Sequence, residues 1–124
     1  MAALAEWPER GLVAIKDQGV ARQIARLRAQ VSGLRAFSYA EVNKRDVGIP
    51  PGPNGSMLKL YYSQTAQILY QNAFDILGDR SSHFEYGNEG WTRDYLYSFA
   101  MSIGGGTSEI QREIIANRIL NLPR

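Results

Sequence analysis

The segment from Gly48 to Gly55 constrains the folding of this 124-residue chain more than any other part of its sequence. It holds three prolines and three glycines in eight residues, a composition that cannot continue a helix. On each side lies a stretch with the apolar spacing of an amphipathic helix. The segment therefore predicts a loop that joins two antiparallel helices.

The first of these helices is expected over residues 17–43. Asp17 at its start and Lys44 and Arg45 at its end complement the helix dipole. Gly33 costs about 1 kcal/mol relative to alanine, and we expect it to permit close approach by a neighbouring helix. Apolar residues recur in steps of three and four along one face, at Val20, Ile24, Leu27, Val31 and Leu34, with Phe37 or Ser38 and then Val42 extending the stripe.

The second helix is expected over residues 56–77, with Asn54 or Ser56 as its N-terminal cap and Gly78 as its C-terminal cap. Its expected buried side consists of Leu58, Tyr61, Tyr62, Thr65, Ile68, Leu69, Asn72 and Ile76.

A third helix is expected over residues 89–102, and its anchors are expected to be Trp91, Tyr95, Leu96 and Phe99. Three glycines at 104–106 end it. A fourth helix begins at Thr107 or Ser108, where Ser108 and Gln111 fit the S-x-x-Q capping box. Ile110, Ile114 and Leu122 give this last helix an apolar side.

No stretch alternates convincingly enough for a sheet. The fold class is therefore all-α and four-helix-bundle-like, with antiparallel neighbouring helices. We divide the chain into a lead-in segment at 1–16 and a helical bundle at 17–124.

Composition excludes several kinds of site. The chain has no cysteine and one histidine, His83, which rules out a disulfide framework, a thiol nucleophile and a Cys/His zinc cluster. No run approaches the roughly 20 apolar residues of a membrane span, and the N-terminus lacks the features of a secretory signal. We expect a soluble cytoplasmic protein.

The arginines of the first helix, such as Arg22 and Arg26, share a face and leave two interpretations open. They could meet an acidic partner, or they could form an ordinary solvated face. Aromatic residues do not interleave with them, and the net charge is only +2, so we expect no nucleic acid partner.

The strongest local signal for a ligand is the stretch from Gly104 to Gln111. Its glycines let the backbone approach another group closely, and the helix N-terminus that follows suits an anion such as a phosphate. The alternative is a tight turn between two helices with a good cap. The residues alone leave both interpretations open.

Residues 105–124 closely resemble the C-terminal signature of the flavin-dependent acyl-CoA dehydrogenases, which has the form GGTSEIQRxIIAxRxLxLPR. Upstream, residues 52–60 resemble the Pro-x-x-Ser-x-x-Lys entry into a bundle helix of that family. Residues 75–78 resemble the end of the same helix. The resemblance covers roughly residues 15–124, most strongly at the end.

The resemblance implies a C-terminal helical domain that has lost its first bundle helix. It implies that the complete enzyme converts an acyl-CoA thioester to the 2-enoyl-CoA with FAD as cofactor. It places FAD contacts at Gly106, Thr107 and Glu109 and oligomer contacts on the helical bundle, in a homo- or hetero-oligomer.

One departure from the family concerns the catalytic base. Many members carry a glutamate two residues before the FAD-binding threonine, and here that position is Gly105, which has no group to accept a proton. The family's flavin motif near residues 75–79 is also degraded, with aspartates at Asp75 and Asp79. We therefore expect the isolated chain to be inactive and assign no catalytic residue. The alternative function is a non-catalytic assembly module or a partner subunit of a mixed oligomer.

Overall fold

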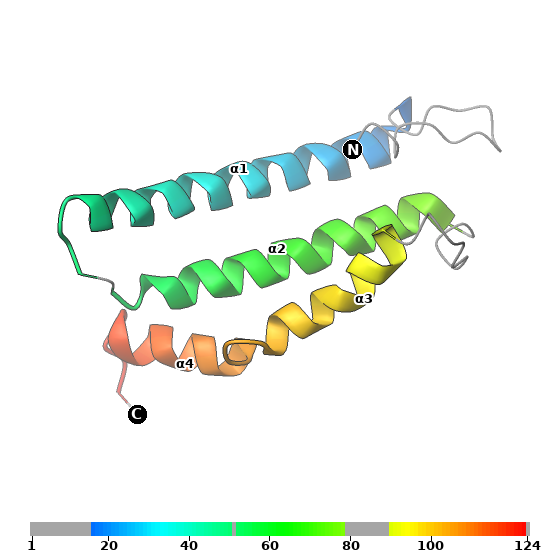
Figure 1. Ribbon diagram of the computed structural model, residues 1–124. Helices are drawn as coiled ribbons and strands as arrows, with labels where there is room; N and C mark the ends of the chain where they lie inside the picture. Colours follow the sequence, from blue (N-terminus) through cyan, green and yellow to red (C-terminus); the bar gives the residue numbers. More distant parts are fainter. Residues whose placement is uncertain (1–15, 51, 79–89, 124) are drawn as a thin grey trace.

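The computed structural model describes residues 16–50, 52–78 and 90–123. These residues form four α-helices and no strand: α1 (Gln18–Asp46), α2 (Asn54–Leu77), α3 (Gly90–Ile103) and α4 (Ser108–Arg118), as Figure 1 shows. The predicted all-α, four-helix fold class is therefore confirmed. Most of the 1–16 lead-in, the Glu89 start of the third helix, Asp79 and His83 lie outside the described residues.

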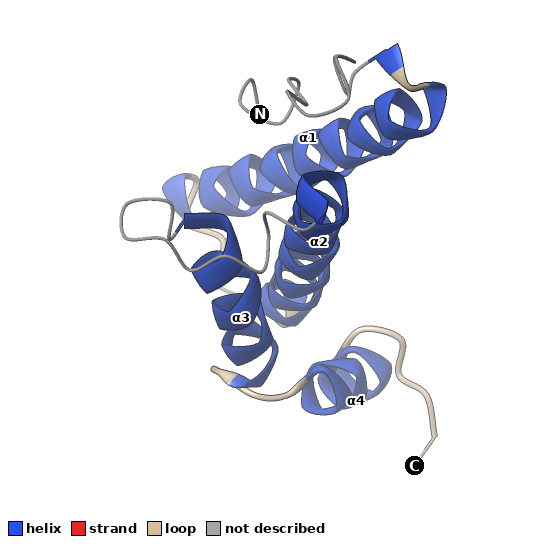
Figure 2. Ribbon diagram, turned by 90° about the vertical axis from the view of Figure 1, so that its right-hand side faces the viewer, coloured by secondary structure: helices blue, strands red, loops and turns tan. Residues whose placement is uncertain are grey.

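α2 is the central helix of the fold, because it packs against each of the other three. In Figure 1, α1 lies antiparallel along one side of α2, while α3 and α4 follow one another along the opposite side. Figure 2 shows that α4 leaves the end of α3 at a steep angle and does not turn back against it. The antiparallel pairing predicted for every neighbour therefore holds for α1 and α2 but not for α3 and α4. The glycine turn redirects the chain along α2 without reversing it.

α1 begins as the sequence predicts and runs three residues further than expected. The Asp17 carboxylate accepts a hydrogen bond of 3.0 Å from the Val20 backbone N–H and so caps the helix. Leu27 is buried, but Val42 is 53% exposed and Val31 is also exposed. The predicted apolar face of α1 is therefore only partly covered by the other described residues.

Gly33 brings α1 and α2 close together, as the sequence predicts. The Tyr61 hydroxyl on α2 donates a 2.9 Å hydrogen bond to the Gln30 carbonyl on α1. A Cβ added at Gly33 would lie 3.1 Å from that hydroxyl oxygen. A side chain at position 33 would therefore press on a bonded tyrosine.

The two ends of α2 differ in how well they were predicted. Pro53 occupies the N-cap position without a side-chain hydrogen bond, so the predicted caps at Asn54 and Ser56 are wrong. The Asn54 amide instead donates to the Glu41 carboxylate at 3.2 Å. Gly78 ends the helix with a φ of 56°, and its N–H bonds to the Phe74 carbonyl, which confirms the predicted C-terminal cap.

The small apolar core lies at the C-terminal end of α2. Ala73 and Ile76 are buried there, and Val20, Leu77 and Trp91 pack around them. Two residues of the predicted buried side of α2, Tyr62 and Ile68, are exposed instead.

α3 has apolar residues on two sides. On the inner side, the ring of Tyr95 lies 5.0 Å from that of Phe74, measured between centroids. On the outer side, Leu96 is 56% exposed, and Phe99 is also exposed although its ring contacts Tyr95. These two residues are therefore not the core anchors that the sequence predicts. A helix that is apolar on two sides is typical of one that is covered on both.

None of the four described helices combines the length and hydropathy that a membrane span requires.

Candidate cofactor-contacting turn

The turn between α3 and α4 uses glycines where the backbone requires them. Gly105 and Gly106 have φ angles of 72° and 100°, in the region that side chains disfavour. A Cβ on Gly106 would lie only 2.8 Å from the Gln111 side-chain nitrogen. Nothing lies within 4 Å of the corresponding position on Gly105, so this side of the turn is open.

Thr107 caps α4. Its hydroxyl oxygen accepts a hydrogen bond of 3.4 Å from the Ile110 backbone N–H. The predicted capping box of Ser108 and Gln111 is therefore wrong, because the cap lies one residue earlier. Counted from the cap at Thr107, Gln111 lies one position further into the helix than predicted. Its side chain is buried there and donates a 2.8 Å hydrogen bond to the Gly105 carbonyl. Gln111 thus holds the glycine turn from inside the fold.

Lys59 on α2 holds the same turn from the other side. Its ammonium nitrogen lies 2.5 Å from the Gly106 carbonyl oxygen and 3.1 Å from that of Ser102, and it donates to both. One side chain therefore fixes the end of α3 and the start of α4 against α2. We did not predict this role, because the partners are carbonyls more than forty residues away in sequence. The sequence signals were a lysine inside a largely apolar helix and its place as the lysine of the Pro-x-x-Ser-x-x-Lys motif.

Glu109 lies next to Thr107 on the surface of α4. The Glu109 carboxylate accepts hydrogen bonds from its own backbone N–H and from the Thr107 hydroxyl. These two bonds, the backbone one foremost, hold the pKa of Glu109 below its usual value of 4.5. The nearby charges of Arg112 and Lys59 act in the same direction. Arg112 approaches the carboxylate to 3.4 Å.

The three residues predicted to contact a cofactor therefore meet at one short stretch of surface. Thr107 and Glu109 supply side-chain hydrogen-bonding groups, and Gly106 supplies backbone held by Lys59. Gly105, at the position of the family's base, offers open space and no proton-accepting side chain. The described residues contain no cluster of side chains suited to a metal ion. The turn therefore gathers hydrogen-bonding groups at the surface, and it brings no general base at position 105.

Comparison with known families identifies the class. Residues 2–120 match the family model described as "Acyl-CoA dehydrogenase, C-terminal domain". The chain therefore belongs to the acyl-CoA dehydrogenase family, whose members generally bind FAD.

Individual relatives agree with this assignment. The chain is 36% identical over 101 residues to acyl-CoA dehydrogenase IpdE1 of Mycobacterium tuberculosis. This alignment covers 80% of this chain and 26% of that protein. The chain is also 39% identical over 94 residues to acyl-CoA dehydrogenase IpdE1 of Mycolicibacterium smegmatis. That alignment covers 75% of this chain and 24% of that protein. The chain thus spans about a quarter of the length of these curated relatives.

The fold also has a counterpart of known structure. A chain of the ChsE4-ChsE5 complex from Mycobacterium tuberculosis superposes with a TM-score of 0.78 at 24% sequence identity. The match covers 92% of this chain and 31% of that one. At this identity the likeness shows a shared fold.

Proposed function

We propose that this chain is the C-terminal part of an FAD-dependent enzyme that oxidises an acyl-CoA thioester to the 2-enoyl-CoA. Its own contribution would be FAD contacts from the turn between α3 and α4, together with oligomer contacts from the helices, in the cytoplasm. The observation that carries the proposal is the meeting of Gly106, Thr107 and Glu109 at the N-terminus of α4, in a chain that belongs to this family.

The residues present fit such a cofactor. The open side of Gly105 leaves room for a ligand against the backbone. The Thr107 hydroxyl and the ionised Glu109 are groups that can bond to the ribose and ribityl hydroxyls of a dinucleotide. When bound, FAD would supply the hydride acceptor, and these residues would hold and orient it.

Titration of the isotopically labelled chain with FAD tests the contacts, because backbone amide resonances detect weak binding. We expect the largest shifts at Gly106, Thr107 and Glu109. Thr107→Val should remove them, whereas Glu113→Gln, an exposed change on the same helix, should not. Shifts confined to other helices, or unaffected by Thr107→Val, would contradict these contacts.

We further propose that the chain alone does not turn over substrate. Gly105 has no proton acceptor, and the chain spans about a quarter of its curated relatives. A panel of acyl-CoA thioesters with FAD and an artificial electron acceptor should give no 2-enoyl product. Formation of 2-enoyl product faster than in a heat-denatured sample would disprove the proposal that the chain alone is inactive.

A second candidate is a non-catalytic assembly module or a partner subunit of a mixed oligomer. The outer side of α3, with Leu96, Phe99 and Ile103 exposed, favours it. The solved structure that shares this fold is itself a complex, of ChsE4 with ChsE5. Light scattering across a concentration series tests association. A monomer at high concentration would count against an assembly role.

A further inference from the structure

The end of α3 and the glycine turn after it share a cation that comes from another helix. The Ser102 carbonyl belongs to the last turn of α3, where carbonyls have no partner inside the helix. α3 has no basic residue in that turn, so the positive charge that favours a helix C-terminus comes from Lys59 on α2. The same ammonium donates to the Gly106 carbonyl. One side chain of α2 therefore bonds to both sides of the glycine turn.

The bond to Gly106 also orients the next backbone amide. In a planar trans peptide the carbonyl and the following N–H point in opposite directions. Because the Gly106 carbonyl points toward Lys59, the Thr107 N–H points away from that ammonium. In the part of the chain that the structure describes, no acceptor bonds to this N–H. Lys59 thus sets the direction of a backbone donor that is left for a ligand.

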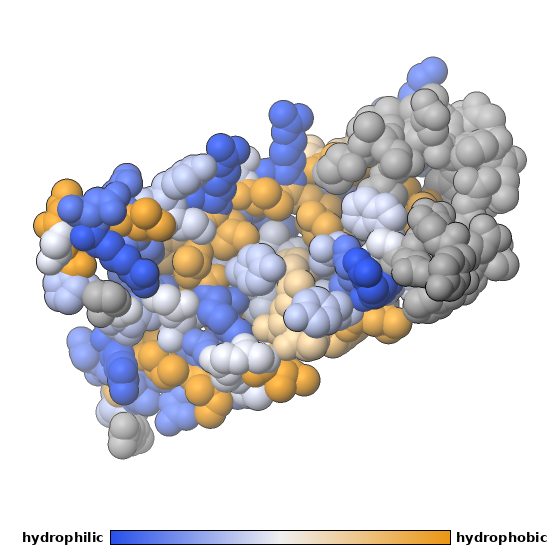
Figure 3. All heavy atoms as spheres, in the orientation of Figure 1, coloured by the Kyte–Doolittle hydropathy of each residue, from blue (hydrophilic) through white to orange (hydrophobic). Residues whose placement is uncertain are grey.

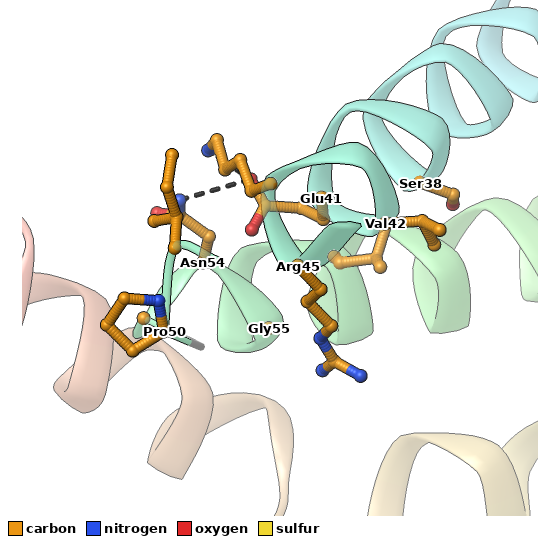
Figure 4. A pocket seen from close by; sticks show the side chains of 11 residues that line it. Ser38, Glu41, Val42, Arg45, Pro50, Asn54 and Gly55 are labelled. Atoms are coloured by element: carbon orange, nitrogen blue, oxygen red, sulfur yellow. Dashed lines mark hydrogen bonds and ion pairs between the residues drawn. The ribbon is translucent and has the colours of Figure 1, made fainter. Parts of the chain in front are cut away.

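Lys59 lies on a part of α2 that α1 holds in place. The Asn54 amide donates to Glu41 on one side of it, and the Tyr61 hydroxyl donates to the Gln30 carbonyl on the other. Figure 4 shows the Asn54 side chain turned toward Glu41. Figure 3 shows apolar side chains gathered where α1 and α2 meet. The ammonium therefore reaches the turn from a helix that is itself fixed.

An ammonium group suits this position because it has three hydrogens and can bond to two carbonyls at once. The residues of both carbonyls, Ser102 and Gly106, are half-buried, so the loss of a donor there costs free energy. The charge also reaches Glu109, whose pKa is lowered chiefly by its own backbone N–H and to a smaller extent by Lys59. Both the hydrogens and the charge at position 59 therefore act on the turn.

We propose that Lys59 is the positioning residue of the cofactor-contacting turn. Its ammonium holds the Gly106 carbonyl toward α2 and so presents the Thr107 N–H to the cofactor. Lys59 acts through this backbone and does not touch the cofactor itself. The inference rests on the proposed function, since it concerns how the same turn holds FAD.

The absence of cysteine from the sequence allows a test in which only the end of one side chain changes. Lys59→Cys is alkylated in urea and then refolded. Alkylation with 2-bromoethylamine rebuilds a side chain of lysine length that ends in an ammonium. Alkylation with 1-bromopropane gives the same length without charge or donor. Lys16→Cys, at an exposed lysine just before α1, receives both treatments as the matched control.

Two measurements are made on each form, after circular dichroism has shown that it is helical. The residual dipolar coupling of the Thr107 N–H bond reports the orientation of that bond and needs no ligand. Titration with FAD, followed by the amide shifts of Gly106, Thr107 and Glu109, reports the affinity.

The aminoethyl form of Lys59→Cys should match the unmodified chain in both measurements. The propyl form should have an altered coupling at Thr107, with the couplings of α2 unchanged, and should bind FAD about tenfold more weakly. The two alkylated forms of Lys16→Cys should not differ from each other.

Two further variants separate position from stability. Ile76→Val loosens the core at the C-terminal end of α2 and should leave both the Thr107 coupling and the FAD affinity unchanged. If the propyl form does not refold, Lys59→Gln takes its place. Its amide nitrogen is about one bond short of the lysine nitrogen and should not reach both carbonyls, so the same changes are expected.

Equal Thr107 couplings and equal FAD affinities in the aminoethyl and propyl forms would overturn the proposal. It would also be overturned if Ile76→Val bound FAD as weakly as the propyl form, since stability alone would then explain the loss. If FAD caused no shifts in the unmodified chain, the proposed function would fail. A Thr107 coupling that still followed the ammonium would then support the orienting role of Lys59, and one that did not would overturn it.

Discussion

The Lys59 ammonium on α2 donates to the carbonyl of Gly106, 47 residues further along the chain. The backbone of the proposed cofactor-contacting turn is thus positioned by the central helix. A second bond, to Ser102, secures the end of α3 to the same nitrogen.

Lys59→Met should destabilise the fold by about 2 kcal/mol, because hydrogen bonds to a charged group contribute roughly 1.5–3 kcal/mol and two half-buried carbonyls lose their partner. Urea unfolding followed by circular dichroism measures the change. The control is Lys44→Met, which removes a half-buried ion pair with Glu41 between residues of the same helix and should cost less, about 1 kcal/mol. If both variants lost the same free energy of unfolding, the two hydrogen bonds of Lys59 would contribute no special stability to the turn.

Gly106→Ala should cost more stability than Gly105→Ala. Both substitutions place a Cβ on a backbone with positive φ, at about 1–2 kcal/mol each. Only at Gly106 does the new atom also collide with Gln111, whose bond to the Gly105 carbonyl is then lost, for roughly 1 kcal/mol more. Denaturation midpoints of the two variants, measured side by side, decide this. Equal midpoints would show that Gln111 moves away freely, and the reverse order would contradict the prediction.

Gly33 and Tyr61 should show strong coupling in a double-mutant cycle. Gly33→Ala alone gains about 1 kcal/mol of helix propensity but pushes on the Tyr61 hydroxyl, so we expect little net gain. In a Tyr61→Phe background the hydroxyl is absent, and the same change should stabilise by about 1 kcal/mol. Additive effects in urea unfolding would contradict the close approach of α1 and α2.

Glu41 should make stability depend on pH in the acid range. The hydrogen bond from Lys44, its charge and the Asn54 amide hold the pKa of Glu41 below the ordinary value of 4.5. The folded protein therefore binds this proton less readily than the unfolded chain. The resulting stabilisation is present above the unfolded pKa and is lost as pH falls through the folded pKa.

Glu41→Gln should accordingly flatten the decline in unfolding midpoint below pH 4.5, and high salt should reduce its effect. Glu113→Gln, at an exposed glutamate outside the described ion pairs, is the control. An identical acid profile for both variants would refute the prediction.

Local signals predicted the helices well. Asp17 and Gly78 act on backbone groups within four residues, so each could be located from sequence alone. The loop before α2 was also predicted, because proline and glycine act where they stand, but α2 begins at Asn54, inside the segment 48–55 assigned to that loop. The cap at Thr107 was misplaced by one residue, since threonine and serine are both good caps and only the tertiary contact of Gln111 distinguishes them.

Long-range features escaped prediction for a different reason. The apolar spacing of α1 shows which residues share a face, but not which neighbour covers that face, and so it did not reveal that Val31 and Val42 are exposed. The role of Lys59 depends on carbonyls of another helix end, which no spacing rule reveals. The proposed cofactor contacts at Gly106, Thr107 and Glu109 came from family resemblance and stay a prediction.

The position of α2 between the other three helices has a consequence for how the molecule opens. Fraying of α1 or of α4 exposes only one side of α2, so each outer helix can detach while the remaining contacts persist. Complete exposure of α2 requires that all of them separate. Its amide hydrogens should therefore exchange with solvent more slowly than those of the outer helices, with α2 forming the last unit to open.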